Sequence, residues 1–141
     1  MKLNNEFLIA LYLRELNSIV NNTITKKLKG EGLTPTQITA IRIIGHKNLL
    51  TITELSDAMS IRKATASGII DRLEGLNIVV REKDSKDKRI TYIKFSKEGS
   101  KLSKRISNLM REAFNEVFKP FSEEEKELIR EKLENMIERL K

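Results

Sequence analysis

The chain has 141 residues, of which 39% are hydrophobic and 33% charged, and it carries a net charge of +7 with no cysteine. This length suits one domain with a hydrophobic core, and the absence of cysteine excludes disulfides, thiol redox switches and cysteine nucleophiles. Nothing in the composition indicates an oxidising compartment, so we expect a cytoplasmic protein.

The start of the chain has apolar side chains mostly at three- and four-residue steps, which predicts one long amphipathic helix ending near Gly30. Its longest apolar run, residues 7–13, is followed at once by Arg14 and Glu15. This run is too short for a membrane span and has no signal-peptide cleavage region after it. We therefore expect no membrane partner.

Two short helices are predicted next from the residues at their starts. Residues 34–37, Thr-Pro-Thr-Gln, combine a Thr N-cap, a Pro at the first helical position and a Gln three residues after the cap. A helix should run from there to about Gly45. Residues 51–54, Thr-Ile-Thr-Glu, form a second capping box and should open a helix that ends at Met59.

A fourth helix is predicted from Lys63 to about Leu76, after a turn at residues 60–62. Asn77 follows it and can take the left-handed conformation that ends many helices. With its apolar residues inward, the segment would present short polar and basic side chains of the kind that reach base edges in a DNA major groove. These are Arg62, Lys63, Thr65, Ser67 and Arg72. The alternative is an ordinary amphipathic helix with a solvated face.

Two short strands joined by a polar turn are predicted after this helix. The β-branched residues 78–80 lead in, and residues 91–95 alternate in the period-two pattern of a half-buried strand. Residues 82–89 lie between them without an apolar side chain and include Lys83, Lys86, Lys88 and Arg89. Such a tip is suited to reach a polyanion. Helix, turn, helix and basic hairpin is the order of a winged helix-turn-helix.

The positive charge of the chain is concentrated in this region. Residues 60–105 hold 13 Lys or Arg and 6 Asp or Glu, which gives this segment a net charge of +7. The rest of the chain holds 14 basic and 14 acidic residues and is neutral. This distribution is the electrostatic footprint of a nucleic-acid-binding protein, and the alternative is a basic face that only aids solubility.

Two helices are predicted at the end of the chain. One should run from near Lys97 to Phe118 and end before Pro120, and a capping box at residues 122–125 opens the last. Its apolar stripe, together with that of the first helix, exceeds what a winged helix needs to close its core. We therefore expect a homodimer built from both ends of the chain. The alternative is a larger monomeric bundle.

Patterns of catalysis and metal binding are not found. The chain has no Gly-rich phosphate loop, no nucleophile elbow and no His-containing pair, and the carboxylates after Ser122 alternate with basic residues on a helix face. We expect no enzyme, no catalytic residue, no metal and no cofactor. His46, the only histidine, is more consistent with a surface or helix-cap role than with a pocket or a metal ligand.

Three stretches carry a family resemblance: LTPTQITAIRII, TITELSDAMSIRKATASGIIDRLEGLNIVVRE and DKRITYIKFSKEG. Together they span residues 33–99 and resemble the multiple antibiotic resistance regulator (MarR) family of winged-helix transcription factors. The chain departs from the family pattern at three positions. Arg62 replaces a frequent N-cap Asp unless Ser60 supplies the cap, Gly68 replaces a frequent long polar contact, and Asn77 replaces Gly.

The resemblance implies a mostly α fold with a small β-hairpin wing, in which a winged helix-turn-helix is flanked by N- and C-terminal dimerisation helices. Residues 1–30 would be the first dimerisation helix, 31–98 the DNA-binding lobe, and 99–141 the remaining dimerisation helices. The implied function is a ligand-responsive repressor that binds an inverted-repeat operator in duplex DNA as a homodimer. The alternative is a winged helix used for protein or RNA contact.

The resemblance also implies roles for single residues. The fourth helix would enter the major groove, and Arg89 would enter the minor groove with Asp87 holding it in place. Other DNA contacts would come from the wing at Lys86 and Lys88 and from the polar face of the fourth helix. Tyr12 and His46 would border the pocket of a small-molecule effector. The target sequence, the regulated genes and the effector do not follow from the sequence.

Overall fold

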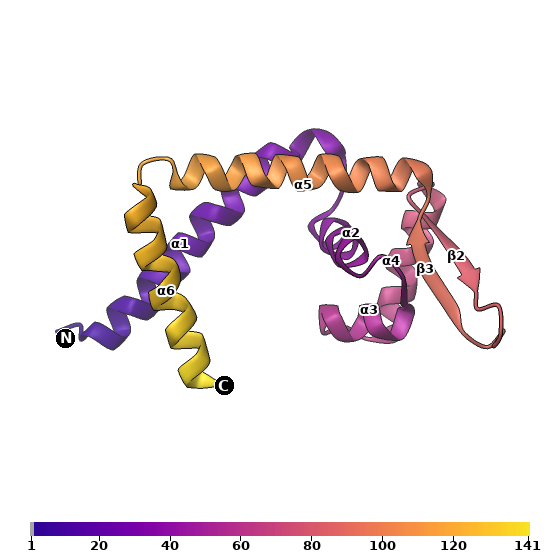
Figure 1. Ribbon diagram of the computed structural model, residues 1–141, viewed down its shortest axis with the longest axis horizontal. Coiled ribbons are helices and arrows are strands. Elements are labelled where there is room, and N and C mark those ends of the chain that lie inside the picture. The colour runs from indigo at the N-terminus through magenta and orange to yellow at the C-terminus, as the bar shows by residue number, and fades with distance from the viewer. Residues whose placement is uncertain (1) are drawn as a thin grey trace. The chain divides into compact units, whose positions relative to one another are not determined.

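The computed structural model describes residues 2–141 and is mostly helical with one small sheet (Figure 1). Its elements are α1 (Asn5–Leu28), the 3₁₀-helix η1 (Lys29–Glu31), α2 (Pro35–Lys47), β1 (Leu50–Thr51), α3 (Ile52–Met59), α4 (Lys63–Gly75), β2 (Val79–Lys83), β3 (Thr91–Phe95), α5 (Lys97–Phe118) and α6 (Glu123–Leu140). The predicted fold class, mostly α with a small β-hairpin wing, is confirmed.

The chain divides into two compact units. The central unit comprises residues 28–109, and the terminal unit comprises the described residues up to Lys27 together with residues 110–141. The central unit therefore holds α2 to α4, the sheet and the first half of α5. Each unit has its own packing and is described separately.

The starts of α2 and α3 follow from their caps. At α2, Thr34 Oγ1 accepts a hydrogen bond from the Gln37 backbone N–H at 3.2 Å, and Gln37 Oε1 accepts one from the Thr34 N–H at 3.0 Å. At α3, Thr51 Oγ1 accepts from the Glu54 N–H at 3.1 Å. These bonds satisfy amide groups that have no partner inside the helix. Asn77 has the predicted left-handed backbone, with φ at 59°.

The sheet has three antiparallel strands in the order β1-β3-β2. In the hairpin, Val79 pairs with Phe95 and Lys83 with Thr91. The third strand, β1, pairs Leu50 with Ile93 and was not predicted, because two residues are too short to show an alternating pattern. The hairpin is therefore supported on its β3 side by the chain that leads into α3.

Aliphatic side chains from the helices and the sheet form the core of the central unit. Its largest fully buried members are Ile41, Ile44, Leu50, Leu55, Ile70, Leu73, Val79, Ile93 and Ile106. Burying each such side chain stabilises the fold by about 1.5–3 kcal/mol. Close packing extends to Gly99, where a Cβ atom would lie 1.8 Å from the Ile78 carbonyl oxygen. Helix α5 can begin against the hairpin only because that position is a glycine.

The helices of the terminal unit leave their apolar side chains uncovered. Helix α6 has no buried residue, and α1 buries only Leu28. Large apolar side chains of α1 and α6 that remain exposed include Phe7, Leu11, Leu16, Ile19, Leu128, Leu133, Met136 and Ile137. A patch of this kind on a folded chain indicates an interaction surface. Within residues 2–141 no helix is long and apolar enough to cross a membrane.

An ion pair fixes η1 to α5 inside the central unit. Arg105 donates from Nη2 to Glu31 Oε2 at 2.9 Å and from Nε to Oε1 at 3.0 Å. The Glu31 side chain is only 15% exposed, and the hydrogen bond from Arg105 lowers its pKa below the usual 4.5. A lowered folded-state pKa stabilises the fold above the usual value, and this contribution is lost as the pH falls through the folded pKa.

We expect Glu31→Gln to lower the melting temperature by a few degrees at pH 7 and to reduce its difference between pH 7 and pH 3. The measurement is thermal unfolding by circular dichroism at both pH values. Glu82→Gln is the control, because its pair with Lys94 lies on the surface of the hairpin and contributes little. An equal loss for Glu31→Gln at both pH values would contradict this account.

Candidate nucleic-acid interface

Helix α4 has one buried and one polar face. Ala66, Ile69, Ile70 and Leu73 are its buried residues. The predicted contact residues lie on the rest of its surface: Arg62, Lys63, Thr65 and Arg72 are exposed and Ser67 is half-buried. Throughout residues 2–141, no carboxylate pairs with Arg62, Lys63 or Arg72. Their charges therefore remain available to a polyanion.

The N-terminus of α4 has no side-chain cap. Arg62 occupies the N-cap position without a side-chain hydrogen bond to the helix. Ser60 does not replace it, because Ser60 ends α3 in a left-handed conformation with φ at 54°. The first amide groups of α4 thus lie beside the cations of Arg62 and Lys63. This combination favours a phosphate group.

Gly68 lies inside α4 without a structural requirement for glycine. Its φ is not positive, and a Cβ atom built there would meet no atom within 4 Å. A glycine inside a helix costs about 1 kcal/mol relative to alanine. The fold therefore does not require glycine at this position.

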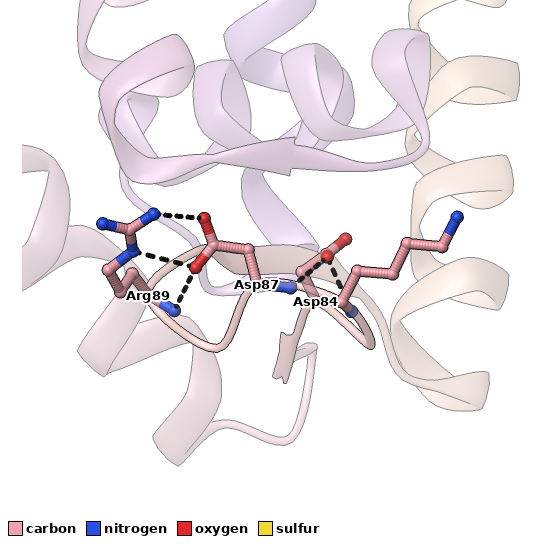
Figure 2. Close-up of polar contacts among 4 residues, drawn as sticks. Asp84, Asp87 and Arg89 are labelled. Carbon is pink, nitrogen blue, oxygen red and sulfur yellow. Dashed lines mark hydrogen bonds and ion pairs between the residues drawn. The ribbon is translucent and has the colours of Figure 1, made fainter.

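The loop between β2 and β3 is organised by Asp84. Its Oδ2 accepts hydrogen bonds from the backbone N–H groups of Lys86 at 3.0 Å and Asp87 at 2.8 Å (Figure 2). Ile90 closes the loop through its N–H to the Asp87 carbonyl at 3.0 Å. This role of Asp84 was not predicted. The available signal was an Asp at the start of a polar turn, where its side chain often binds the amides two and three residues on.

Asp87 holds the guanidinium of Arg89 in a bidentate contact. Arg89 donates from Nε to Oδ1 and from Nη2 to Oδ2, both at 3.0 Å, and its backbone N–H also donates to Oδ1 (Figure 2). The Arg89 side chain is nevertheless 91% exposed. The hydrogen bonds from Arg89 lower the pKa of Asp87, and the same contact raises the pKa of Arg89. The cation is therefore oriented and still accessible.

Arg81 joins the hairpin to α4. From β2 its Nη2 donates to Asp71 Oδ1 at 2.7 Å, and its Nη1 donates to Glu74 Oε1 at 3.0 Å. The two carboxylates lie one turn apart on α4. Because Arg81 pairs with both, its positive charge offsets part of the negative charge of the two carboxylates on α4. This contact was not predicted from the sequence.

The predicted effector residues lie in different units. His46 is exposed near the end of α2 and lines an open hollow in the central unit together with Arg42, Lys47 and Ser103. Tyr12 is exposed on α1 in the terminal unit and does not line that hollow. The pairing of Tyr12 with His46 at an effector stays a prediction. Across residues 2–141 no group of His, Cys, Asp or Glu is arranged to hold a metal ion.

The chain is similar to known winged-helix proteins. A family model described as the MarR family matches residues 33–91. An uncharacterized HTH-type transcriptional regulator, YsmB from Bacillus subtilis (strain 168), is 27% identical over 80% of this chain and 77% of its own length. Among solved structures, a MarR family protein from Bacillus stearothermophilus is 21% identical, covers 99% of both chains and has a TM-score of 0.84.

One further structure holds DNA. It is a mutant MarR from E. coli complexed with operator DNA, which is 20% identical, covers 96% of this chain and 99% of its own, and has a TM-score of 0.77. At these identities the two structures show the fold. They place the helices and the hairpin wing of this chain in a known winged-helix architecture.

The Asp87–Arg89 contact predicts a titration behaviour. We expect the Asp87 carboxyl to titrate below its usual pKa of 3.8, because protonation would break the hydrogen bonds from Arg89. Arg89→Ala should move the midpoint back toward that value, whereas Lys88→Ala should leave it unchanged. The measurement is ¹³C NMR of the side-chain carboxyl between about pH 2.5 and 7, a range that spans the usual carboxyl pKa. The same midpoint in the parent and in Arg89→Ala would contradict the contact.

Proposed function

We propose that the chain, whose residues 33–91 match the MarR family model, is a MarR-family transcriptional regulator that binds a specific duplex DNA sequence as a homodimer. The observation that carries the proposal is the lobe of residues 31–98. One compact unit presents an unpaired basic helix face and an oriented, exposed arginine on a hairpin. The relatives are transcriptional regulators, so the chain is not an enzyme.

Helix α4 reads the major groove. Its exposed Lys63 and Thr65 and its half-buried Ser67 are short or flexible polar side chains near the helix N-terminus, which suits contact with base edges. Arg62 and Arg72 lie at opposite ends of the helix and contact phosphates on either side of the groove. Phosphate contacts set the register of the protein on DNA, and base contacts set the sequence preference.

The wing binds the neighbouring minor groove through Arg89. A narrow minor groove has an enhanced negative potential that attracts arginine. Asp87 keeps the guanidinium in one orientation, so less conformational entropy is lost on binding. Lys86 and Lys88 belong to the same loop and contact the flanking phosphates.

A second copy of the chain covers the exposed apolar faces of α1 and α6. The dimerisation segments are residues 1–30 and 99–141. A two-fold dimer presents two copies of α4 and matches an inverted repeat with half-sites about one helical turn apart.

The protein acts in the cytoplasm, where such an operator is accessible. Binding of a small-molecule effector releases the DNA, which makes the protein a repressor.

The dimer predicts twice the chain mass of 16.3 kDa in solution. Light scattering after size exclusion should give this mass at micromolar concentration. Leu133→Glu combined with Ile137→Glu should yield monomers, because it places charges on the exposed apolar face of α6. Glu131→Ala is the control on the polar side of the same helix. A folded monomer of the parent chain would contradict the dimer.

The wing predicts a specific loss of DNA binding. Arg89→Ala should weaken binding to an operator selected from bound genomic fragments by at least about tenfold, and lower the slope of log affinity against log salt by about one per protomer. Its melting temperature should stay unchanged because the side chain is exposed. Lys29→Ala is the control, because it also removes one exposed positive charge but lies outside the lobe of residues 31–98.

Fluorescence anisotropy with duplex DNA and with single-stranded RNA of the same sequence supplies the measurement. Parental affinity and salt slope in Arg89→Ala would show that the wing does not engage DNA. Equal or tighter binding of the parent to RNA would replace the proposed function with RNA contact.

A further inference from the structure

Arg81 makes the only hydrogen bonds or ion pairs between α4 and the hairpin of residues 79–95 in the part of the chain that the structure describes. Its two terminal nitrogens go to two different carboxylates, at 2.7 Å to Asp71 and 3.0 Å to Glu74. These two bonds add a directional restraint to the burial of Val79 and to the bond from the Ile78 N–H to the Leu73 carbonyl, which hold the start of the hairpin. Charge-assisted hydrogen bonds from a planar guanidinium are directional.

Arg81 lies where the apolar packing of the hairpin ends. Val79 and Arg81 are two residues apart and share one face of the strand, the face on which Val79 is buried. After Val79, β2 has no buried side chain, and its last two residues are exposed. Arg81, whose side chain is 29% exposed, is therefore the last contact before the strand extends toward the loop that carries Arg89.

We propose that Arg81 is a positioning residue that sets the angle between the wing and α4, so that both engage one DNA duplex together. The proposal rests on the proposed DNA-binding function. A major-groove helix and a minor-groove arginine on one rigid lobe must match the spacing of adjacent grooves. Asp71 and Glu74 are both on α4. The two hydrogen bonds that Arg81 donates to them, here called the Arg81 fork, therefore tie the hairpin directly to that helix.

The fork predicts that the contribution of Arg89 depends on Arg81. In the parent, Arg89→Ala should weaken operator binding by at least about tenfold. Arg81→Met should itself weaken binding about tenfold, and in that background Arg89→Ala should cost less than about threefold. Met keeps an unbranched apolar stem and removes the fork, which guards against loss of the fold. The measurement is a double-mutant cycle by fluorescence anisotropy, with melting temperatures recorded for every variant.

Breaking the fork from the other side separates geometry from charge. Asp71→Asn with Glu74→Gln removes two negative charges, whereas Arg81→Met removes one positive charge. On charge alone the first variant should bind DNA more tightly and the second more weakly. If the fork positions the wing, both should bind more weakly, and both should reduce the effect of Arg89→Ala.

Glu82→Gln is the matched control. Glu82 pairs with Lys94 at 2.9 Å inside the same hairpin and makes no link to α4. In this background Arg89→Ala should keep its full effect. If Arg81 only stabilises the fold, Arg81→Met will lower the melting temperature, and Arg89→Ala will cause the same loss of operator affinity in that background as in the parent. This result would overturn the proposal. Tighter DNA binding by the variant that combines Asp71→Asn with Glu74→Gln would also overturn it. Failure of the parent chain to bind duplex DNA would instead reject the proposed function.

Discussion

The packing of α4 into the core of the central unit fixes which of its side chains face outward and where the hairpin begins. Ile70 and Leu73 are fully buried, so the opposite side of the helix must face outward with its polar residues. The chain then turns at Asn77 and returns as β2, whose Val79 is buried in the same core. A single small core therefore sets both the orientation of α4 and the start of the hairpin.

The acidic residues that follow α3 in the lobe are paired within it, whereas several of its described basic residues are not, so the positive charge is concentrated on the unpaired side chains. Each carboxylate between residues 60 and 105 accepts a hydrogen bond or forms an ion pair within the lobe. Asp71 and Glu74 bind Arg81, Glu82 binds Lys94, Asp87 binds Arg89, Asp84 binds loop amides, and Glu98 accepts from Asn77. Cations such as Lys63, Arg72 and Lys88 have no acidic partner among residues 2–141. The paired carboxylates therefore leave these cations free to attract a polyanion.

Much of this fold could be predicted from local patterns. The capping box at residues 34–37, the left-handed Asn77 and the strand at residues 91–95 were each predicted from a few neighbouring residues, and all three are present. Contacts between distant segments could not be predicted. β1 consists of two residues that pair only because β3 lies beside them, and the Arg81 fork joins residues seven and ten positions apart across a turn. The proposed contact residues lie on the expected face of α4. The DNA groups that they contact are defined only in a complex of the protein with DNA.

Chemical protection of bound DNA shows whether one lobe contacts both grooves. Dimethyl sulfate methylates guanine N7 in the major groove and adenine N3 in the minor groove, so a single reaction reports on both. We expect protected guanines in two half-sites about one helical turn apart, with protected adenines in the minor groove beside each half-site. Protection confined to one groove, or to a single half-site, would contradict this expectation.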